Sequence, residues 1–293
     1  MNKSRIKIAK PDIVKYFDGL NTRVFKISDL ASILTREREF WRLAKSTTTN
    51  AFAAFLLEQK LLEKYYFPFP HRSETRYVWG EVPFLGIIQT IKERSYFTHY
   101  TAMTIHGLTE QLPKTIYLNH EQPARPQNSN LEQGRIAAAF KNRPRVSNNE
   151  IEFGDTRVCL VNGMSTDQLG VIDMTANYGA DLPVNIRVTN IERTLIDIAV
   201  RPIYSGGVFE VQKAYEQAKS KVSVNRLVAM LQKLRYVYPY HQAIGFYLER
   251  AGVPETSLDL LRQLPMEYDF YLAHQMGETD YIQSWRLFVP KGF

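Results

Sequence analysis

The first 82 residues carry three segments of helical periodicity followed by two β-favouring runs, and this order strongly limits the folds that the segment can adopt. The first predicted helix covers residues 12–17, where apolar side chains recur at helical spacing. The second is expected to begin at Ser28, which is placed to cap it. It either ends within residues 35–38 or continues to residue 43.

The third helix is preceded by Ser46-Thr47-Thr48-Thr49-Asn50, a run of residues that favour helix caps, and it is expected to begin near Thr48. Two predicted strands follow at residues 64–69 and 76–82, separated by a polar tip. Three helices followed by a two-stranded ribbon is the order of a winged helix-turn-helix domain. The stretch between the second and third helices is longer than a compact turn, so the motif carries an insertion.

In such a domain the third helix enters the DNA major groove, and the ribbon tip contacts the backbone or the minor groove. Hydroxyl and amide groups at a helix start can meet phosphate oxygens and base edges together with free backbone amides. The run can also serve only to cap the helix, which accounts for one or two of its residues. The candidate DNA-binding residues are Lys45, Ser46, Thr47, Thr48, Thr49, Asn50 and Lys60 around the helix, and His71, Arg72, Ser73 and Arg76 at the ribbon.

The positive charge of the chain is concentrated in the same segment. Residues 1–82 contain 15 Lys and Arg against 9 Asp and Glu, whereas the remaining residues contain 22 against 21. A basic module on a nearly neutral body is typical of a protein that binds a polyanion such as nucleic acid. A basic surface that only aids solubility would give the same counts, so both explanations stay open on charge alone.

After Pro83 the pattern changes, and a second domain is expected over residues 84–293, with a subdivision conceivable near residue 200. Its first part mixes short helices with strand-sized segments, of which residues 136–140 fit a strand and a helix equally well. The strands expected here cover residues 96–97, 114–119, 151–153, 157–161 and 182–188.

From Thr189 onward helical periodicity dominates. Thr189 and Glu192 have the spacing of a capping box, and Arg193 and Asp197 are placed to pair at i,i+4. We assign these charged residues to helix organisation rather than to catalysis. Further helices are expected at residues 208–219, 224–236 and 241–251, followed by β-favouring residues near the end of the chain. The predicted class is α+β: an amino-terminal winged helix-turn-helix, then a mixed domain with a helical carboxyl-terminal half.

Motifs for catalysis or metal binding are missing from the sequence. There is no glycine-rich nucleotide loop, nucleophile elbow or His-Glu-x-x-His pair, and Asp155 is not followed by the Glu-x-Lys of a metal-dependent nuclease. The single Cys159 cannot form an internal disulfide, and no apolar run is long enough to span a membrane. We expect no catalytic residue, metal or cofactor, no enzymatic activity and no membrane contact, and a cytoplasmic location.

Two blocks of the sequence resemble the AbiEi-type antitoxins of type IV toxin-antitoxin and abortive-infection systems. The first is Tyr96-Phe-Thr-His-Tyr-Thr-Ala-Met-Thr-Ile-His-Gly-Leu108, followed by Leu112-Pro-Lys-Thr-Ile-Tyr-Leu118. The second is Val188-Thr-Asn-Ile-Glu-Arg-Thr-Leu-Ile-Asp197, followed by Arg201-Pro202 and Gly206-Gly207. The resemblance runs from about residue 10 to about residue 225. The insertion in the helix-turn-helix and the carboxyl-terminal region depart from the family pattern.

The resemblance implies a winged helix that represses its own operon at inverted repeats in double-stranded DNA, where two copies could bind one operator. It also implies a larger domain that counteracts a nucleotidyltransferase-like toxin in phage defence, with or without a stable complex. Two other classes remain open. One is a nucleic-acid-processing enzyme with an unrecognised active site in residues 84–200, and the other is a scaffold whose winged helix binds protein.

Overall fold

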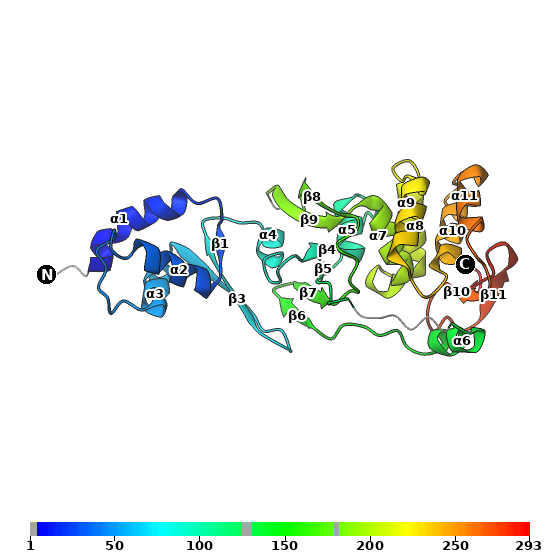
Figure 1. Cartoon of the computed structure of the whole chain (residues 1–293), viewed down its shortest axis with the longest axis horizontal. Coiled ribbons are helices and arrows are strands. Elements are labelled where there is room, and N and C mark those ends of the chain that lie inside the picture. The colour runs from blue at the N-terminus through cyan, green and yellow to red at the C-terminus, as the bar shows by residue number, and fades with distance from the viewer. Residues whose placement is uncertain (1–4, 125–130, 179–181) are drawn as a thin grey trace. The chain divides into compact units, whose positions relative to one another are not determined.

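The computed structural model describes residues 5–124, 131–178 and 182–293 (Figure 1). The chain divides into two compact units, Met1–Glu93 and Arg94–Phe293. No helix in the described ranges is both long and apolar enough to cross a membrane.

The first unit combines helices with a small antiparallel sheet of order β1-β3-β2, in which Val24 pairs with Val78 and Leu62 pairs with Trp79. Its elements are α1 (Arg5–Asp18), β1 (Val24–Phe25), α2 (Ile27–Glu37), α3 (Thr49–Glu58), β2 (Leu62–Phe67), β3 (Glu74–Trp79) and α4 (Phe84–Ile88). The three predicted helices and the two-stranded ribbon are therefore present in the predicted order. The first strand, β1, adds a third strand along β3.

Aromatic side chains from α1, β1 and β3 meet in the core of this unit. The ring of Phe17 stacks on Trp79 at a centroid distance of 4.6 Å and meets Phe25 edge to face at 5.4 Å. The indole N–H of Trp79 donates to Asp18 Oδ1 at 2.8 Å, so its polar atom is also satisfied. The helical spacing of apolar residues thus correctly predicted which faces of the helices are buried.

Two details at the helix starts test the predicted caps. The prediction for Ser28 is wrong: α2 already begins at Ile27, and the backbone N–H of Lys26 donates to the carboxylate of Asp29 at 2.7 Å. The prediction that the third helix begins near Thr48 is confirmed: α3 begins at Thr49, and Thr48 caps it, with its Oγ1 accepting a hydrogen bond from the backbone N–H of Ala51 at 3.2 Å.

The second unit contains a six-stranded mixed sheet of order β6-β7-β5-β4-β9-β8. Its strands are β4 (Tyr96–Phe97), β5 (Thr115–Asn119), β6 (Glu150–Phe153), β7 (Thr156–Val161), β8 (Val171–Ala176) and β9 (Val184–Thr189). The short central strand β4 runs parallel to β9 through Phe97 and Val188, and antiparallel to β5. The helix α5 (His99–Ile105) follows β4 directly.

Beyond the sheet the chain is mainly helical, and α8 to α11 gather on the far side of α7 from the strands (Figure 1). These elements are α7 (Ile191–Val200), η1 (Pro202–Tyr204), α8 (Val208–Ala218), α9 (Val224–Leu234), α10 (Tyr240–Arg250) and α11 (Glu255–Arg262). A small sheet of order β10-β12-β11 ends the chain, formed by β10 (Phe270–Tyr271), β11 (Thr279–Ile282) and β12 (Leu287–Pro290), with η2 (Gln283–Trp285) between the last two.

Residues 136–140, for which strand and helix were both open, lie in the helix α6 (Gln133–Lys141). The predicted capping box of Thr189 and Glu192 is wrong. Asn190 caps α7 instead, because its Oδ1 accepts from the backbone N–H of Arg193 at 2.8 Å. The predicted pair of Arg193 with Asp197 is confirmed, with Nε 2.8 Å from Oδ1.

Candidate nucleic-acid interface

The helix α3 has one face in the core and one in solvent. Phe52, Ala53, Phe55 and Leu56 are buried and hold the helix against the rest of the first unit. The opposite face is exposed and consists of Asn50, Ala51, Ala54 and Glu58. Because three of these four side chains are short, this face can approach the floor of a groove closely, and alanine methyl groups can contact the methyl group of thymine.

At the start of α3 one hydroxyl group caps the helix, whereas several other polar side chains make no hydrogen bond within the described fold. Thr48 caps the helix, and the capping explanation therefore covers this residue. Within the described part of the chain, no hydrogen bond is made by the side chains of Ser46, Thr49 or Asn50. Ser46 and Asn50 are exposed and Thr49 is half-buried, so the start of the helix presents free polar groups to solvent.

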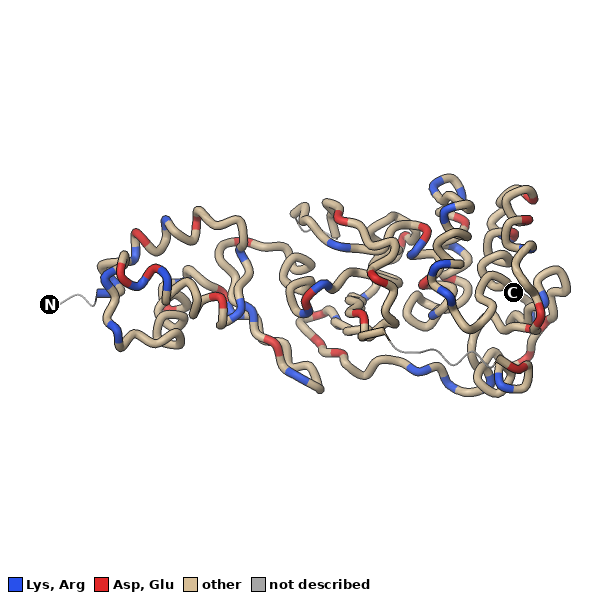
Figure 2. Tube along the Cα trace, in the orientation of Figure 1, with Lys and Arg blue, Asp and Glu red and all other residues tan. Residues whose placement is uncertain are grey.

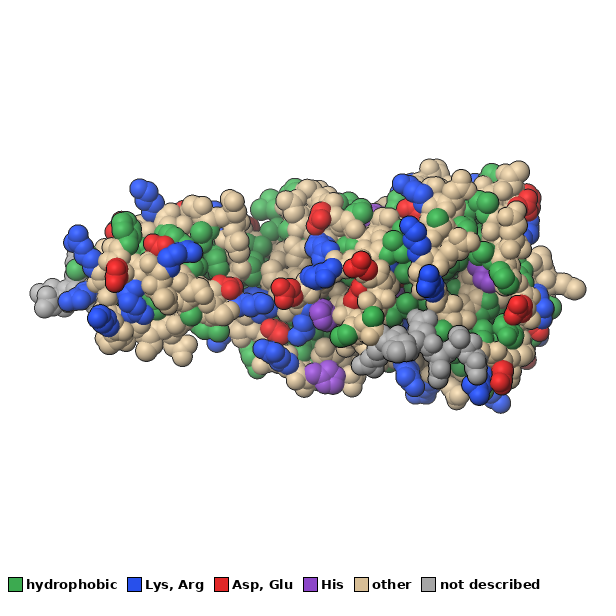
Figure 3. Space-filling model, in the orientation of Figure 1, with side chains coloured by type: hydrophobic (Ala, Val, Ile, Leu, Met, Phe, Trp, Pro, Cys, Tyr) green, Lys and Arg blue, Asp and Glu red, His purple; other side chains and the backbone are tan. Residues whose placement is uncertain are grey.

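The cationic candidates around the helix are also exposed. Lys45 lies just before α3, and Lys60 lies just beyond its carboxyl end, where φ is +54°. Lys10 extends from α1 to Gln59 and donates to its Oε1 at 2.9 Å. Lys and Arg are spread along the whole first unit (Figure 2). On the face seen in Figure 3, their side chains lie among small areas of hydrophobic side chains.

The ribbon formed by β2 and β3 ends in an exposed polar tip. His71, Arg72 and Ser73 are all exposed there. Arg72 Nε lies 3.9 Å from Glu74 Oε1, and the Arg72 side chain is 81% exposed, so this contact hardly restricts the guanidinium. The tip thus offers the donors that a contact with phosphate requires.

Arg76 differs from the other ribbon candidates because it lies in the interior and is only 2% exposed. Its Nη2 donates to the carbonyl oxygens of Thr90 and Ile91 at 2.7 and 2.9 Å, and its Nη1 to Glu74 Oε2 at 3.2 Å. Burial raises the pKa of Glu74, but Lys92 and Arg76 outweigh it and hold the pKa below its usual value. Arg76 thus connects β3 to the residues after α4 and has no surface to offer to DNA.

A buried polar network occupies the interior of the second unit. Asp197 accepts from Thr98 Oγ1 at 3.0 Å as well as from Arg193, and Arg193 Nη1 donates to the Leu169 carbonyl at 2.7 Å. His106 Nε2 lies 2.6 Å from the Thr189 carbonyl oxygen. The two sequence blocks at residues 96–118 and 188–207 therefore meet through their polar residues, which are used in contacts inside the fold.

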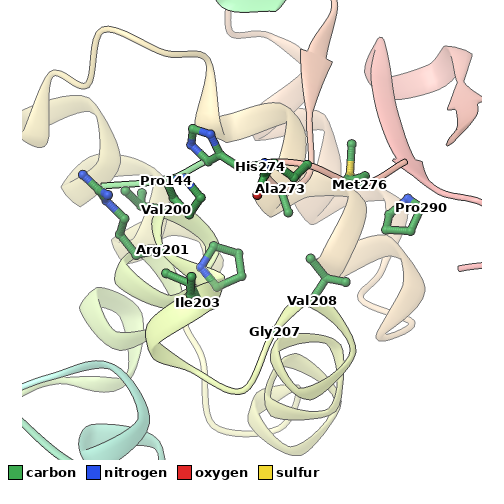
Figure 4. Close-up of a pocket in the computed structure, with 12 residues that line it drawn as sticks. Pro144, Val200, Arg201, Ile203, Gly207, Val208, Ala273, His274, Met276 and Pro290 are labelled. Carbon is green, nitrogen blue, oxygen red and sulfur yellow. The ribbon is translucent and has the colours of Figure 1, made fainter. Parts of the chain in front are cut away.

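The second unit also has an apolar pocket of about 390 Å³ (Figure 4). Its wall consists mainly of proline and aliphatic side chains, and its lining contains no carboxylate, hydroxyl or thiol side chain. The two cationic or titratable groups beside it contact backbone carbonyls: Arg201 Nη1 donates to the Arg145 carbonyl at 2.8 Å, and His274 Nδ1 lies 3.1 Å from the Ala139 carbonyl oxygen. Elsewhere in the described residues, no group of three or more His, Cys, Asp and Glu is placed to hold a metal ion.

Sequence reasoning located the start of α3 but missed neighbouring residues. Ala51 and Ala54 could have been found, because Ala54 lies four residues after Asn50 and three after Ala51, and these two spacings place side chains on one face of a helix. The role of Arg38 could not have been found, because it depends on how the linker after α2 folds. The Arg38 guanidinium donates to the carbonyl oxygens of Ala44 and Thr47 in this linker, at 2.6 and 2.9 Å.

No family model matches the chain, and no curated protein matches it at a significant level. Among solved structures, the chain is similar to the crystal structure of the RV2827C protein from Mycobacterium tuberculosis, with a TM-score of 0.60 and 15% sequence identity. The match covers 96% of this chain and 91% of that one. At this identity the likeness shows the fold alone. This chain therefore has an RV2827C-like α+β fold.

Proposed function

We propose that the first unit is a winged helix-turn-helix domain that binds double-stranded DNA, and that the protein represses transcription from its own promoter. The observation that carries the proposal is the free face of α3. This face is exposed, short in side chains and headed by Asn50, whose side-chain amide makes no hydrogen bond within the described residues. An asparagine on such a face can form two hydrogen bonds to adenine in the major groove.

The connectivity supports the proposal. Three helices with the sheet order β1-β3-β2 form the arrangement in which a ribbon flanks a groove-reading helix. The ribbon tip carries His71, Arg72 and Ser73, and the whole segment has an excess of positive charge. Together these features provide one element, α3, to contact base edges and a second, the ribbon tip, to contact the DNA backbone.

The proposal extends to an antitoxin role in a type IV toxin-antitoxin system. It rests on the two sequence blocks that resemble AbiEi-type antitoxins, which build one interior network around Asp197. Coexpression of the whole chain with a nucleotidyltransferase-like protein encoded beside it tests this role. We expect restored growth, and unrelieved toxicity at equal expression would reject the antitoxin part while leaving DNA binding standing.

DNA binding is tested with the duplex upstream of the protein's own coding sequence and a scrambled duplex of equal composition. We expect preference for the upstream duplex and an affinity that falls with salt by a slope of about 0.9 per neutralised phosphate. Asn50→Ala should reduce the preference by about tenfold, because one base contact is lost. Asn21→Ala, a change of the same kind at an exposed position outside α3, is the control and should behave as wild type. Equal affinity for both duplexes would contradict the proposal.

A further inference from the structure

The linker between α2 and α3, residues 38–48, is folded and anchored in the core of the first unit. Trp41 and Leu43 are only 2% and 6% exposed. The indole of Trp41 stacks on Phe52 of α3 at a centroid distance of 5.7 Å and meets Tyr16 of α1 edge to face at 5.5 Å. The linker therefore has a fixed position relative to α3.

Hydrogen bonds fix the remainder of this linker. Arg38 contacts the carbonyl oxygens of Ala44 and Thr47, which lie six and nine residues later. The backbone N–H of Leu43 donates to the Arg38 carbonyl at 3.0 Å, and that of Thr47 donates to the Ala44 carbonyl at 3.0 Å. Arg42 occupies the left-handed region at φ +50°, which turns the chain between two buried side chains.

The side chains that alternate with these anchors point into solvent. Phe40 is 71% exposed, the highest value among the exposed large hydrophobic residues of the described chain, and Arg42 and Lys45 are exposed beside it. In the described residues no carboxylate pairs with Arg42 or Lys45. This protrusion, residues 39–46, therefore presents an aromatic ring and two cations without carboxylate partners at the surface, where a polyanion can reach them.

We propose that this protrusion, residues 39–46, is a third DNA-contacting element, in which Arg42 and Lys45 bind backbone phosphates beside the groove and the Phe40 ring packs on a deoxyribose. The inference rests on the proposed function of α3. When the start of a helix reads a groove, the residues just before it lie at the wall of that groove, which is the phosphate backbone. Lys45 precedes the cap residue Thr48 by three positions, so its charge falls within reach of that wall.

The cationic part is tested with the full chain and the upstream duplex. Arg42→Gln combined with Lys45→Gln should lower the slope of log affinity against log salt by about 1.8, because two phosphate contacts are lost. The control is Lys7→Gln combined with Lys15→Gln, which removes the same charge from exposed positions on α1 and should leave the slope within about 0.3 of wild type.

The aromatic part is tested by hydroxyl-radical footprinting, which reports protection of individual deoxyriboses. Phe40→Ala should weaken binding roughly five- to tenfold through lost apolar contact, leave the salt slope unchanged and remove protection at the edge of the footprint. Protection across the groove read by α3 should remain. Tyr66→Ala, which truncates another exposed aromatic residue of this unit, should leave the edge protection in place.

Three results would overturn the inference. If Asn50→Ala alters binding while the Phe40 and Arg42–Lys45 variants keep the affinity, salt slope and footprint of wild type, α3 binds DNA and the protrusion does not. A loss of self-association or of toxin binding in Phe40→Ala, with DNA binding intact, would show that the protrusion contacts protein instead. If wild type shows no sequence preference and no salt dependence, the proposed function and this inference both fail.

Discussion

Arg193 and Asp197 form an ion pair with almost no exposed surface: Nε lies 2.8 Å from Oδ1, and the side chains are 5% and 8% exposed. Thr98 shares the carboxylate, and the carbonyl of Leu169 accepts from the guanidinium. Burial disfavours the Arg193 charge, but Asp197 outweighs this effect and raises the pKa of Arg193. The pair thus joins α7 to the start of α5 and to the segment before β8.

Asp197→Asn should destabilise the second unit by about 3–5 kcal/mol, because it leaves the Arg193 charge buried without its partner. An exposed pair at similar spacing would lose only about 0.3–0.5 kcal/mol. Urea unfolding measures the difference, with Arg135→Gln as the control, since the Arg135–Glu132 pair is 67% exposed on both sides. If wild type relieves toxicity in the coexpression test and a stable Asp197→Asn protein does not, Asp197 is instead assigned to function.

Gly245→Ala should lower stability by at least about 1–3 kcal/mol through overpacking. A Cβ at Gly245 would lie 2.2 Å from Cζ3 of Trp285, and the indole cannot easily move because its N–H donates to Glu249 Oε2 at 2.9 Å. Gly134→Ala is the matched control: this glycine lies in α6 with no atom within 4 Å of an added Cβ. Thermal unfolding should show a lower midpoint for the first variant and an equal or higher midpoint for the second.

Stability should fall as pH drops from about 6.5 to about 4. Burial lowers the pKa of His99 to about 4, and burial also lowers the pKa of His241 to about 4. In this window the unfolded chain binds protons that the folded chain excludes, so each histidine contributes a slope of up to about 1.4 kcal/mol per pH unit. The contribution of each neutral histidine to stability is therefore present above the unfolded pKa of about 6.5 and is lost as the pH falls towards 4.

His99→Asn should reduce the slope of stability against pH by up to about 1.4 kcal/mol per pH unit, because asparagine cannot titrate and tolerates the left-handed φ of +51° found at this position. Chemical unfolding at several pH values between 4 and 7.5 measures the slope. The exposed His71, changed to Asn, serves as the control. An unchanged slope in His99→Asn would show that acid unfolding proceeds through other groups.

Arg38→Lys should loosen the linker before α3 while keeping its charge, because an ammonium lacks the planar fork that bridges the Ala44 and Thr47 carbonyls. Hydrogen exchange of the backbone amides of residues 43–47 should become at least about tenfold faster, since these amides depend on the linker geometry. The control is Arg36→Lys on the exposed side of α2. Unchanged exchange in Arg38→Lys would mean that Trp41 alone holds the linker.

Local patterns predicted the helices and strands well where one segment determines its own structure. The apolar period located α2 and α3, and the cap-forming run at residues 46–50 located the start of α3. The prediction failed at Glu192, whose carboxylate accepts from Arg226 Nη2 at 2.8 Å, because that partner lies 34 residues away. A neighbouring residue, Asn190, is equally able to cap, and local spacing cannot rank the two.

The candidate site shows the same division. The exposed polar start of α3 follows from sequence, since a helix needs one cap and the run offers five candidates. The interior position of Arg76 cannot be predicted from the sequence, where a basic residue on a ribbon indicates phosphate contact. Only the structure shows that the carbonyl oxygens of Thr90 and Ile91 accept its hydrogen bonds. The fixed position of Phe40 likewise depends on Trp41 finding Phe52 in three dimensions.

The place of β4 in its sheet has a consequence for synthesis of the chain. Phe97 pairs with Val188, which is translated about 90 residues later, so at roughly 5–20 residues per second the inner edge of β4 waits on the order of 5–20 s for its neighbour. During that interval a nascent chain offers an unpaired strand edge in what becomes the middle of a buried sheet. Ribosomes that stall before residue 188 would therefore release aggregation-prone fragments. Where translation pauses before that residue, the emerging chain would need a chaperone.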